Sequence, residues 1–168
     1  MTKIAEETLI LFKPDALQRG VVGDILTRFE RVGLKIVGTK MIRPDVDHYH
    51  KHYEDIGKLR TRAGDEIFGM TLEMMSEGPV IAMVLRGIGA VELVRKLVGG
   101  TEPKAAAPGT IRGDFSHMSY EYANEQKKGI PNLIHASGNV EEAQAEILHW
   151  FSANEIYEYK ALHEKFTR

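Results

Sequence analysis

The sequence predicts an α+β fold, an antiparallel sheet with helices packed on one face. Three observations support this class: short apolar runs rich in strand-forming residues, segments with helical spacing of apolar residues, and their order. The order is strand, helix, strand, strand, helix, then the strand-like "NLIHA", which is typical of a split βαβ arrangement. A chain of 168 residues without linker-like stretches is expected to form one domain, residues 1–168.

The first three elements follow from local patterns. "TLILF" at 8–12 is a compact apolar run that predicts a strand, and Pro14 ends it. In residues 20–33 the apolar side chains fall on one helical stripe, which Gly33 can end. Residues 34–42 alternate between apolar and polar side chains, so we expect a half-exposed strand there.

The later elements are predicted in the same way. "PVIAMVLRG" at 79–87 predicts a strand buried on both faces, and 90–100 predicts a short helix closed by glycines. Asn139 is the expected N-cap of a helix over 139–151, whose first turns carry glutamates where the helix dipole favours them. The glycine-rich segment 99–132 is expected to be irregular and functional, because long loops in compact domains usually serve a site.

The composition excludes several classes of protein. The net charge is −2, so we expect neither a nucleic-acid partner nor a generally basic surface. The absence of cysteine excludes disulfides and thiolate chemistry and agrees with a reducing compartment. The longest uninterrupted apolar stretch, "VIAMVL" at 80–85, is too short to span a bilayer, and the first residues are acidic where a signal peptide is basic. We therefore expect a cytoplasmic protein with no membrane partner.

The histidines of "HYHKHY" at 48–53 are spaced by two, and such side chains share a face only on a strand. Pro44 and Asp45 just before them indicate the start of a helix, on which the histidines splay apart. We therefore expect solvated helix surface here in preference to a metal site. The following segment, 55–76, is expected to be partly helical.

A cluster of basic and small residues predicts an anion site. "GGTEPKAAAPGTIRGDF" at 99–115 holds four glycines, which allow backbone N–H groups to approach a ligand closely. Arginine adds a planar fork that matches phosphate oxygens. Each polar side chain alone is as easily a surface residue or a loop cap, but together they point to phosphate; they are Lys13, Arg95, Thr101, Lys104, Thr110 and Arg112.

His135 lies in "GIPNLIHASGN" between an apolar pair, Leu133 and Ile134, and a small pair, Ala136 and Ser137. The local sequence leaves two interpretations open, a histidine of the core and a histidine held against a reaction site. A neutral imidazole is a nucleophile, and an ordinary pKa of about 6.5 leaves most histidine neutral near pH 7. The phosphate-binding cluster favours the second interpretation.

Several blocks of the sequence resemble those of nucleoside diphosphate kinases, in the same order. They include "FKPDALQRGVVGDILTRFERVGLKIVGTKMI", "HYHKHYED", "PGTIRGDF" and "NLIHAS", and the match covers residues 8–152. The resemblance implies a ferredoxin-like βαββαβ fold. It implies transfer of the γ-phosphoryl group from a nucleoside triphosphate such as ATP to nucleoside diphosphates, by a ping-pong mechanism through a phosphohistidine. It also implies Mg²⁺ as a cofactor and a homo-oligomer, either a tetramer or a hexamer.

The resemblance also assigns roles to individual residues. His135 becomes the nucleophile, Ser137 and Glu146 orient its ring, and Tyr53 lies beside it. For Glu146, plain helix surface is the alternative. Phe68 is the candidate for stacking on the base, with a core phenylalanine as the alternative. The remaining nucleotide contacts are expected from Lys13, Arg95, Thr101, Arg112 and Asn132.

The chain departs from the family pattern at several positions. Ala136 stands where the family usually has glycine, and Gly138-Asn139 stands where it usually has Asp-Ser. Glu102 replaces an asparagine, so its carboxylate must point away from the phosphates or be paired, most simply with Lys104. No acidic pair with metal-ligand spacing stands out, so we expect Mg²⁺ to arrive with the nucleotide, held by phosphates and water.

The sequence leaves two further points open. The chain is longer than the family core around 57–68 and 117–129, and these insertions obscure which aromatic residue meets the base. The altered loop at Ala136 and Gly138 also fits a nucleotide-binding regulator without turnover. A second role in nucleic-acid contact is disfavoured, because no basic stripe is visible.

Overall fold

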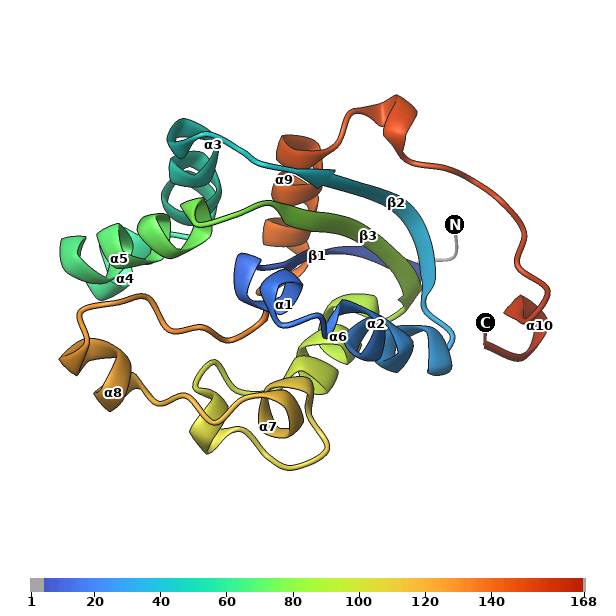
Figure 1. Ribbon diagram of the computed structural model, residues 1–168. Helices are drawn as coiled ribbons and strands as arrows, with labels where there is room; N and C mark the ends of the chain where they lie inside the picture. The colour runs from blue at the N-terminus through green and yellow to red at the C-terminus, as the bar shows by residue number, and fades with distance from the viewer. Residues whose placement is uncertain (1–4, 168) are drawn as a thin grey trace.

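A four-stranded antiparallel sheet forms the centre of the molecule (Figure 1), and the computed structural model describes residues 5–167. β1 pairs with β3 along its whole length, and β4 pairs with the last residues of β1. The sheet and its helices confirm the predicted α+β, ferredoxin-like class. The strand order is β2-β3-β1-β4, with bounds β1 Ala5–Phe12, β2 Lys35–Ile42, β3 Val80–Ile88 and β4 Ile134–Ala136.

The longer helices include those that the sequence predicts over 20–33, 90–100 and 139–151. Their bounds are α2 Val22–Arg31, α5 Asp65–Ser76, α6 Ala90–Val98 and α9 Val140–Trp150. The shorter helical segments are α1 Pro14–Gln18, α3 Val46–His50, the π-helical turn η1 Lys51–Ile56, α4 Leu59–Ala63, η2 Pro103–Ala105, α7 Ile111–Phe115, α8 Tyr120–Glu125, η3 Ala153–Glu155 and α10 Glu164–Thr167. The expected helical content of 55–76 is therefore confirmed.

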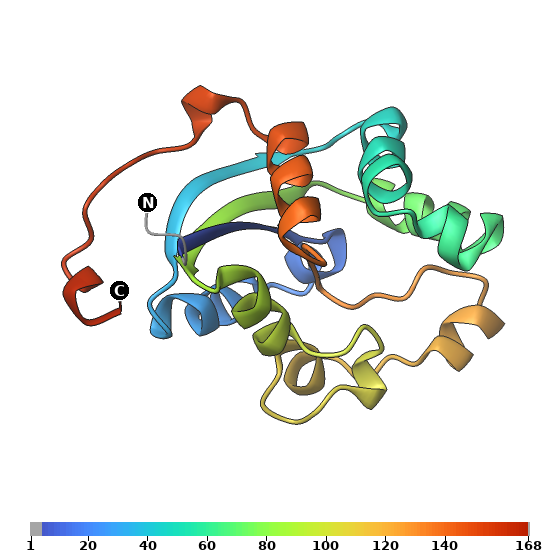
Figure 2. The same ribbon diagram turned by 180° about the vertical axis from the view of Figure 1, so that it is seen from behind.

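Helices cover both faces of the sheet, so the expectation of a single covered face is wrong. Alternate residues of β1 belong to two core clusters, Leu9 with Leu11 and Ile10 with Phe12. α9 packs on the first face, and α2 and α6 pack on the second (Figures 1 and 2). The reason lies in β1 itself, because an apolar run without alternation is typical of a strand that is buried on both faces.

The edge strand β2 is irregular and is covered by the C-terminal segment. Its register with β3 shifts between Ile36 and Gly38, which breaks the simple alternation that the sequence predicts. The backbone N–H of Tyr157 donates to the Val37 carbonyl (2.7 Å), and the Tyr159 hydroxyl donates to the Ile36 carbonyl (2.7 Å). The segment after α9 thus runs back along the sheet and lies against its outer strand (Figure 1).

The same C-terminal segment neutralises two cations that lie opposite each other in the sheet. Lys35 and Arg86 are cross-strand partners, and both are buried. Nζ of Lys35 lies 2.9 Å from a Glu164 oxygen and 3.4 Å from a Glu158 oxygen. Arg86 pairs with Glu7 and with Glu158. Adjacent like charges repel, so these carboxylates are needed to hold the pair in place.

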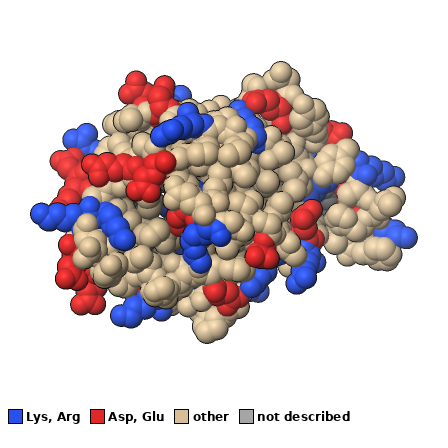
Figure 3. Space-filling model, in the orientation of Figure 1, with Lys and Arg blue, Asp and Glu red and all other residues tan. Residues whose placement is uncertain are grey.

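Acidic and basic side chains are mixed on the surface. In the face that Figure 3 shows, they alternate without a continuous basic stripe, in agreement with the net charge of −2. Among residues 5–167, none of the helices has the length and the apolar character needed to cross a membrane.

Candidate active site

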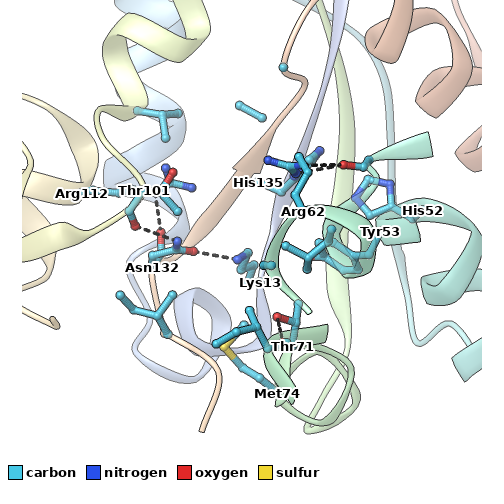
Figure 4. Close-up of a pocket in the computed structure, with 18 of the residues that line it drawn as sticks. Lys13, His52, Tyr53, Arg62, Thr71, Met74, Thr101, Arg112, Asn132 and His135 are labelled. Atoms are coloured by element: carbon cyan, nitrogen blue, oxygen red, sulfur yellow. Dashed lines mark hydrogen bonds between the residues drawn. The ribbon is translucent and has the colours of Figure 1, made fainter. Parts of the chain in front are cut away.

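A cavity of about 610 Å³ opens between the α4–α5 hairpin, the loop after α6 and the start of α9. Its wall brings together side chains that are far apart in the sequence (Figure 4). The residues predicted from the sequence that line it are Lys13, Tyr53, Arg95, Thr101, Arg112, Asn132, His135 and Glu146.

His135 lies on the short strand β4, where its backbone pairs with Leu11, and its side chain is 19% exposed. Its Nε2 atom is 2.8 Å from Oε1 of Glu146, while the Ser137 hydroxyl donates to Oε2 of the same carboxylate at 2.6 Å. A carboxylate only accepts hydrogen bonds, so Nε2 is the protonated nitrogen. The lone pair of Nδ1 is thereby left free for a reaction.

His52 and Tyr53 pack against the ring of His135, which corrects the expectation of solvated helix surface at 48–53. Ring centroids of His52 and His135 are 4.5 Å apart, and those of Tyr53 and His135 are 6.2 Å apart. The indole N–H of Trp150 donates to Nδ1 of His52 at 3.1 Å. His52 Nε2 and the Tyr53 hydroxyl are buried and have no hydrogen-bond partner among residues 5–167. The π-helical turn that carries both residues rotates them inward, and such turns are frequent at functional sites.

Burial sets the charge of these two side chains. Desolvation, together with nearby His135, holds the pKa of His52 well below its usual value, so its ring is neutral. Desolvation also raises the pKa of the Tyr53 phenol, which keeps its proton. The ring of His135 is therefore in contact with two neutral groups, His52 and Tyr53, and with the Glu146 carboxylate.

Lys13 and Asn132 form the polar floor of the cavity (Figure 4). Nζ of Lys13 donates to Oδ1 of Asn132 at 2.7 Å, and Nδ2 of Asn132 donates to the Thr101 carbonyl at 2.9 Å. Burial, with a smaller contribution from Arg112, lowers the pKa of Lys13 to about 8. The floor thus holds a cation that is poorly solvated and that an anionic ligand would stabilise.

Arg112 connects the loop to the strand that carries the histidine. Its guanidinium donates to three backbone carbonyls, those of Asn132 (3.2 Å), Gly99 (3.2 Å) and Ile134 (2.6 Å). Burial lowers the pKa of Arg112 to about 10, so the group stays charged at neutral pH. Arg95, which is exposed at the cavity rim, adds a second guanidinium.

The site offers one set of side chains that could hold a metal ion, in the part of the chain that the structure describes. Ligand atoms of His52, His135 and Glu146 all lie within 4.8 Å of one another. Imidazole nitrogen suits zinc and similar metals, whereas Mg²⁺ prefers oxygen. The ring of His135 and the carboxylate of Glu146 already bind each other, and His52 already accepts from Trp150.

Two expectations about the site differ from the structure. Phe68 is only 7% exposed, belongs to the core cluster under α9 and is not part of the cavity wall, so it is the core phenylalanine and not a stacking surface. Glu102 does not turn to Lys104. Its Oε1 accepts from the backbone N–H of Tyr120 at 2.9 Å, so the backbone of the expected insertion supplies the partner.

The altered loop after Ser137 has a local explanation. Asn139 caps α9 by accepting from the Glu142 backbone N–H (2.8 Å), and the Glu142 carboxylate accepts in turn from the Gly138 N–H (3.2 Å). A Cβ at position 138 would lie 2.4 Å from the Glu142 carboxylate. A side chain at 138 would therefore displace the Glu142 carboxylate from its hydrogen bond with the loop.

The cavity-lining residues that sequence reasoning missed include Arg62, Tyr120 and Glu142. Arg62 and Tyr120 lie in the stretches expected to be insertions, where a resemblance to a family gives no guide. Arg62 donates to the Gly57 carbonyl at 2.9 and 3.2 Å, which anchors it at the wall. A signal for Glu142 exists in the capping pattern Asn-x-x-Glu, but that pattern indicates a helix start and no ligand.

Comparison with known proteins agrees with this geometry. The family model described as nucleoside diphosphate kinase matches residues 6–156. The chain is 46% identical over 159 residues to a nucleoside diphosphate kinase of Borreliella burgdorferi, covering 94% of this chain and 93% of the relative. It is 45% identical over 163 residues to one of Pyrococcus furiosus, covering 97% and 93%.

Solved structures show the same likeness. A nucleoside diphosphate kinase from Borrelia burgdorferi, described as a transition-state mimic with bound vanadate and ADP, superposes with a TM-score of 0.93 at 44% identity, covering 97% of this chain and 96% of that one. A halophilic enzyme of the same name from Halobacterium salinarum, in complex with CDP, gives a TM-score of 0.82 at 35% identity, covering 97% and 98%. The histidine site and these likenesses together place the chain in the nucleoside diphosphate kinase family.

Proposed function

We propose that the protein transfers the γ-phosphoryl group of a nucleoside triphosphate, with ATP as donor, to nucleoside diphosphates through a phosphohistidine at His135. The observation that carries this proposal is the arrangement around its ring. Glu146 fixes the proton on Nε2, so that Nδ1 faces a cavity whose wall holds Lys13, Arg95 and Arg112. The ADP complex of the Borrelia enzyme and the CDP complex of the Halobacterium enzyme support nucleotides as substrates.

The reaction proceeds in two symmetrical halves. The Nδ1 lone pair of His135 attacks the γ-phosphorus, the bond to the bridging oxygen breaks, and the diphosphate leaves with that electron pair. A second diphosphate then enters, and its terminal oxygen attacks the phosphorus while the N–P bond breaks. The Nε2 proton stays in the hydrogen bond with Glu146 throughout, which stabilises the positive charge on the phosphorylated ring.

The other lining residues position the phosphates. Phosphoryl transfer depends mainly on alignment and on positive charge near the equatorial oxygens. Lys13 and Asn132 form the floor, Thr101 lies at the wall, and Arg62 adds a guanidinium that the sequence did not reveal. Tyr53, a neutral phenol beside His135, limits the movement of the ring.

Mg²⁺ is the proposed cofactor, carried by the phosphates of the nucleotide. Two carboxylates line the cavity within residues 5–167: Glu146 is hydrogen-bonded to His135 and Ser137, and Glu142 is hydrogen-bonded to the loop at Gly138. The wall therefore fits an ion that takes most of its oxygen ligands from phosphate and water. When bound, the ion neutralises charge on the phosphates.

We also propose one domain over residues 1–168, a cytoplasmic location and a homo-oligomer, either a tetramer or a hexamer. The packing of the C-terminal segment on the sheet supports a single domain. The absence of cysteine supports a reducing compartment. Light scattering of the purified protein would measure the number of subunits.

Labelling with γ-³²P-ATP tests the reaction. The wild-type protein should acquire an acid-labile, base-stable phosphate, and ATP with GDP should give GTP. His135→Ala should lose both, whereas Gln144→Ala, an exposed change on α9, should keep both. An unlabelled wild type, or GTP formation at the wild-type rate by His135→Ala, would contradict the proposal and favour a regulator that binds nucleotides without turnover.

A further inference from the structure

We propose that Tyr120, held by Glu102, supplies the aromatic surface on which the nucleobase stacks. This inference rests on the proposed function, because it assumes that a nucleotide enters the cavity with its phosphates toward His135. It assigns a binding role to the expected insertion at 117–129.

The choice of Tyr120 follows from the aromatic residues in the cavity wall. Within residues 5–167, only two Phe, Tyr or Trp side chains line the cavity, Tyr53 and Tyr120. Tyr53 is buried against His135 and lies at the phosphoryl end. Phe68 is part of the core. Tyr120 is 43% exposed, so its ring is the one that can accept a base without rearrangement of the core.

The backbone of Tyr120 is fixed from both sides. Ser119 is buried and caps α8 by accepting from the Tyr122 N–H at 3.2 Å. Glu102 accepts from the Tyr120 N–H at 2.9 Å, and the Lys104 N–H donates to the Met118 carbonyl at 3.0 Å. Tyr120 is therefore tied to the loop that also carries Thr101. Because the backbone that carries the ring is already in place, less entropy is lost when the ring binds a ligand.

The cavity has a polar and an apolar part, which suits a nucleotide. Cations and His135 mark the phosphate part, whereas aliphatic side chains line the remainder, namely Leu59, Ile67, Met74 and Ile130. Tyr120 and Arg112 both line this cavity, so the ring and the phosphate-binding cations share one space. A base covered by one aromatic ring and by aliphatic groups gains affinity with little choice among bases.

Calorimetric titration with ADP and with inorganic tripolyphosphate tests the stacking. Tyr120→Ala should weaken ADP about tenfold, which corresponds to about 1.4 kcal/mol, because stacking on one ring is worth that order. Tyr120→Phe should stay within about twofold, because it keeps the ring. Tripolyphosphate, which has no base, should bind equally to all variants.

Tyr122→Ala is the matched control. Tyr122 lies two residues further on α8, is 48% exposed and is not part of the cavity wall. Its loss should leave the affinity for ADP unchanged. The inference is wrong if Tyr120→Ala binds ADP as the wild type does, if it loses tripolyphosphate equally, or if Tyr120→Phe loses as much as Tyr120→Ala.

Labelling at saturating ATP separates this inference from the proposed function. If the wild type is not labelled at His135, the proposed function is wrong, and the inference about Tyr120, which rests on it, is wrong as well. If both the wild type and Tyr120→Ala are labelled while their ADP affinities are equal, only the inference fails.

Glu102 acts as a positioning residue for Tyr120, and its test uses both kcat and KM. Glu102→Ala should raise KM for nucleoside diphosphates and leave kcat within about twofold, because saturating substrate restores the complex. Glu102→Gln should restore KM, since its amide oxygen can accept the same N–H. A fall in kcat at constant KM, or no rescue by glutamine, would contradict the positioning role.

Discussion

Oε1 of Glu146 lies 2.8 Å from Nε2 of His135, and Oε2 of the same carboxylate accepts the Ser137 hydroxyl. Glu146 comes from α9 and is buried, while His135 comes from β4. The contact therefore makes the packing of α9 on the sheet a condition for the orientation of the nucleophile.

Removing the carboxylate should slow the formation of phosphohistidine. We expect Glu146→Ala to reduce this rate about a hundredfold, because a misplacement of about one ångström costs that order. Glu146→Gln should fall between that variant and the wild type, since its amide oxygen can still accept from Nε2 but carries no charge. Quenched-flow labelling with γ-³²P-ATP measures the rate, and a Glu146→Ala variant as fast as the exposed control Gln144→Ala would contradict the assignment.

Binding of ADP should weaken as the pH rises through about 8. Burial and Arg112 lower the pKa of Lys13 to about 8 in the free protein, so its positive charge is lost above that value. Phosphate stabilises the charged form, so binding should take up a proton between pH 8 and the ordinary value of 10.5. Calorimetry in buffers of different ionisation enthalpy measures that proton, and Lys13→Arg should abolish the uptake.

The lowered pKa of Lys13 also makes the free energy of unfolding depend on pH. The unfolded chain binds more protons at Lys13 than the folded chain does between the two pKa values, so this residue makes the free energy of unfolding rise with pH there. Urea unfolding at several pH values measures this free energy. If it falls as the pH rises from 8 to 10.5, and Lys13→Met abolishes that fall, the assigned direction is wrong.

His52 should remain neutral in acid, as the tautomer with the proton on Nε2. Its Nδ1 accepts from Trp150, and burial holds its pKa well below 6.5. Below pH 6.5, His52 binds a proton in the unfolded chain but stays neutral in the folded protein. This difference lowers the free energy of unfolding as the pH falls below 6.5. Nitrogen-15 NMR of the imidazole ring identifies the tautomer, and a proton on Nδ1 at about pH 6 would contradict this prediction.

Gly138→Ala should destabilise the protein by about 1 kcal/mol, the usual value of a helix cap. The added Cβ would lie 2.4 Å from the Glu142 carboxylate and would displace it. Glu142→Ala should cost a similar amount, and the double variant should cost no more than either change alone, because both remove one interaction. Urea unfolding measures all three, and strict additivity would show that the two positions are independent.

The C-terminal segment should separate from the sheet in acid. The backbone N–H of Ser152 and the amine of Lys40 hold the pKa of Glu155 at about 2, and Arg86 lowers the pKa of Glu158. Lowered carboxyl pKa values mean that the stabilisation is present above about 4.5 and is lost as the pH falls toward 2. The amide NMR signals of Tyr157 and Tyr159 should shift over that range before those of α9, and simultaneous changes would contradict local detachment.

Much of the fold could be predicted because short-range patterns determine it. The apolar run at 8–12 and the capped segment 139–151 correspond to β1 and α9 within a few residues. The prediction that helices cover one face of the sheet is wrong, because both faces are covered. The unbroken apolar run from Leu9 to Phe12 already indicated a strand that is buried on both faces. Alternation, and not apolar content alone, determines whether one or both faces of a strand are buried.

The candidate site, like the fold, was predicted only in part from the sequence. His135 and the glycine-rich loop were predicted by motif, because their chemistry constrains residue type and spacing. The burial of His52 was missed, since the extra residue of a π-helical turn changes which side chains face inward. Phe68 was placed wrongly and Tyr120 was missed, because each depends on how a segment of unusual length packs against the rest of the chain.

The hydrogen bonds from Tyr157 and Tyr159 to β2 occupy carbonyls on the outer edge of the sheet. Unpaired strand edges are templates for unwanted pairing between molecules, and this segment covers part of such an edge. A chain shortened before Ser152 would expose those carbonyls together with Lys35 and Arg86. Any contact with another molecule that used this edge would therefore be made across the C-terminal segment or would displace it.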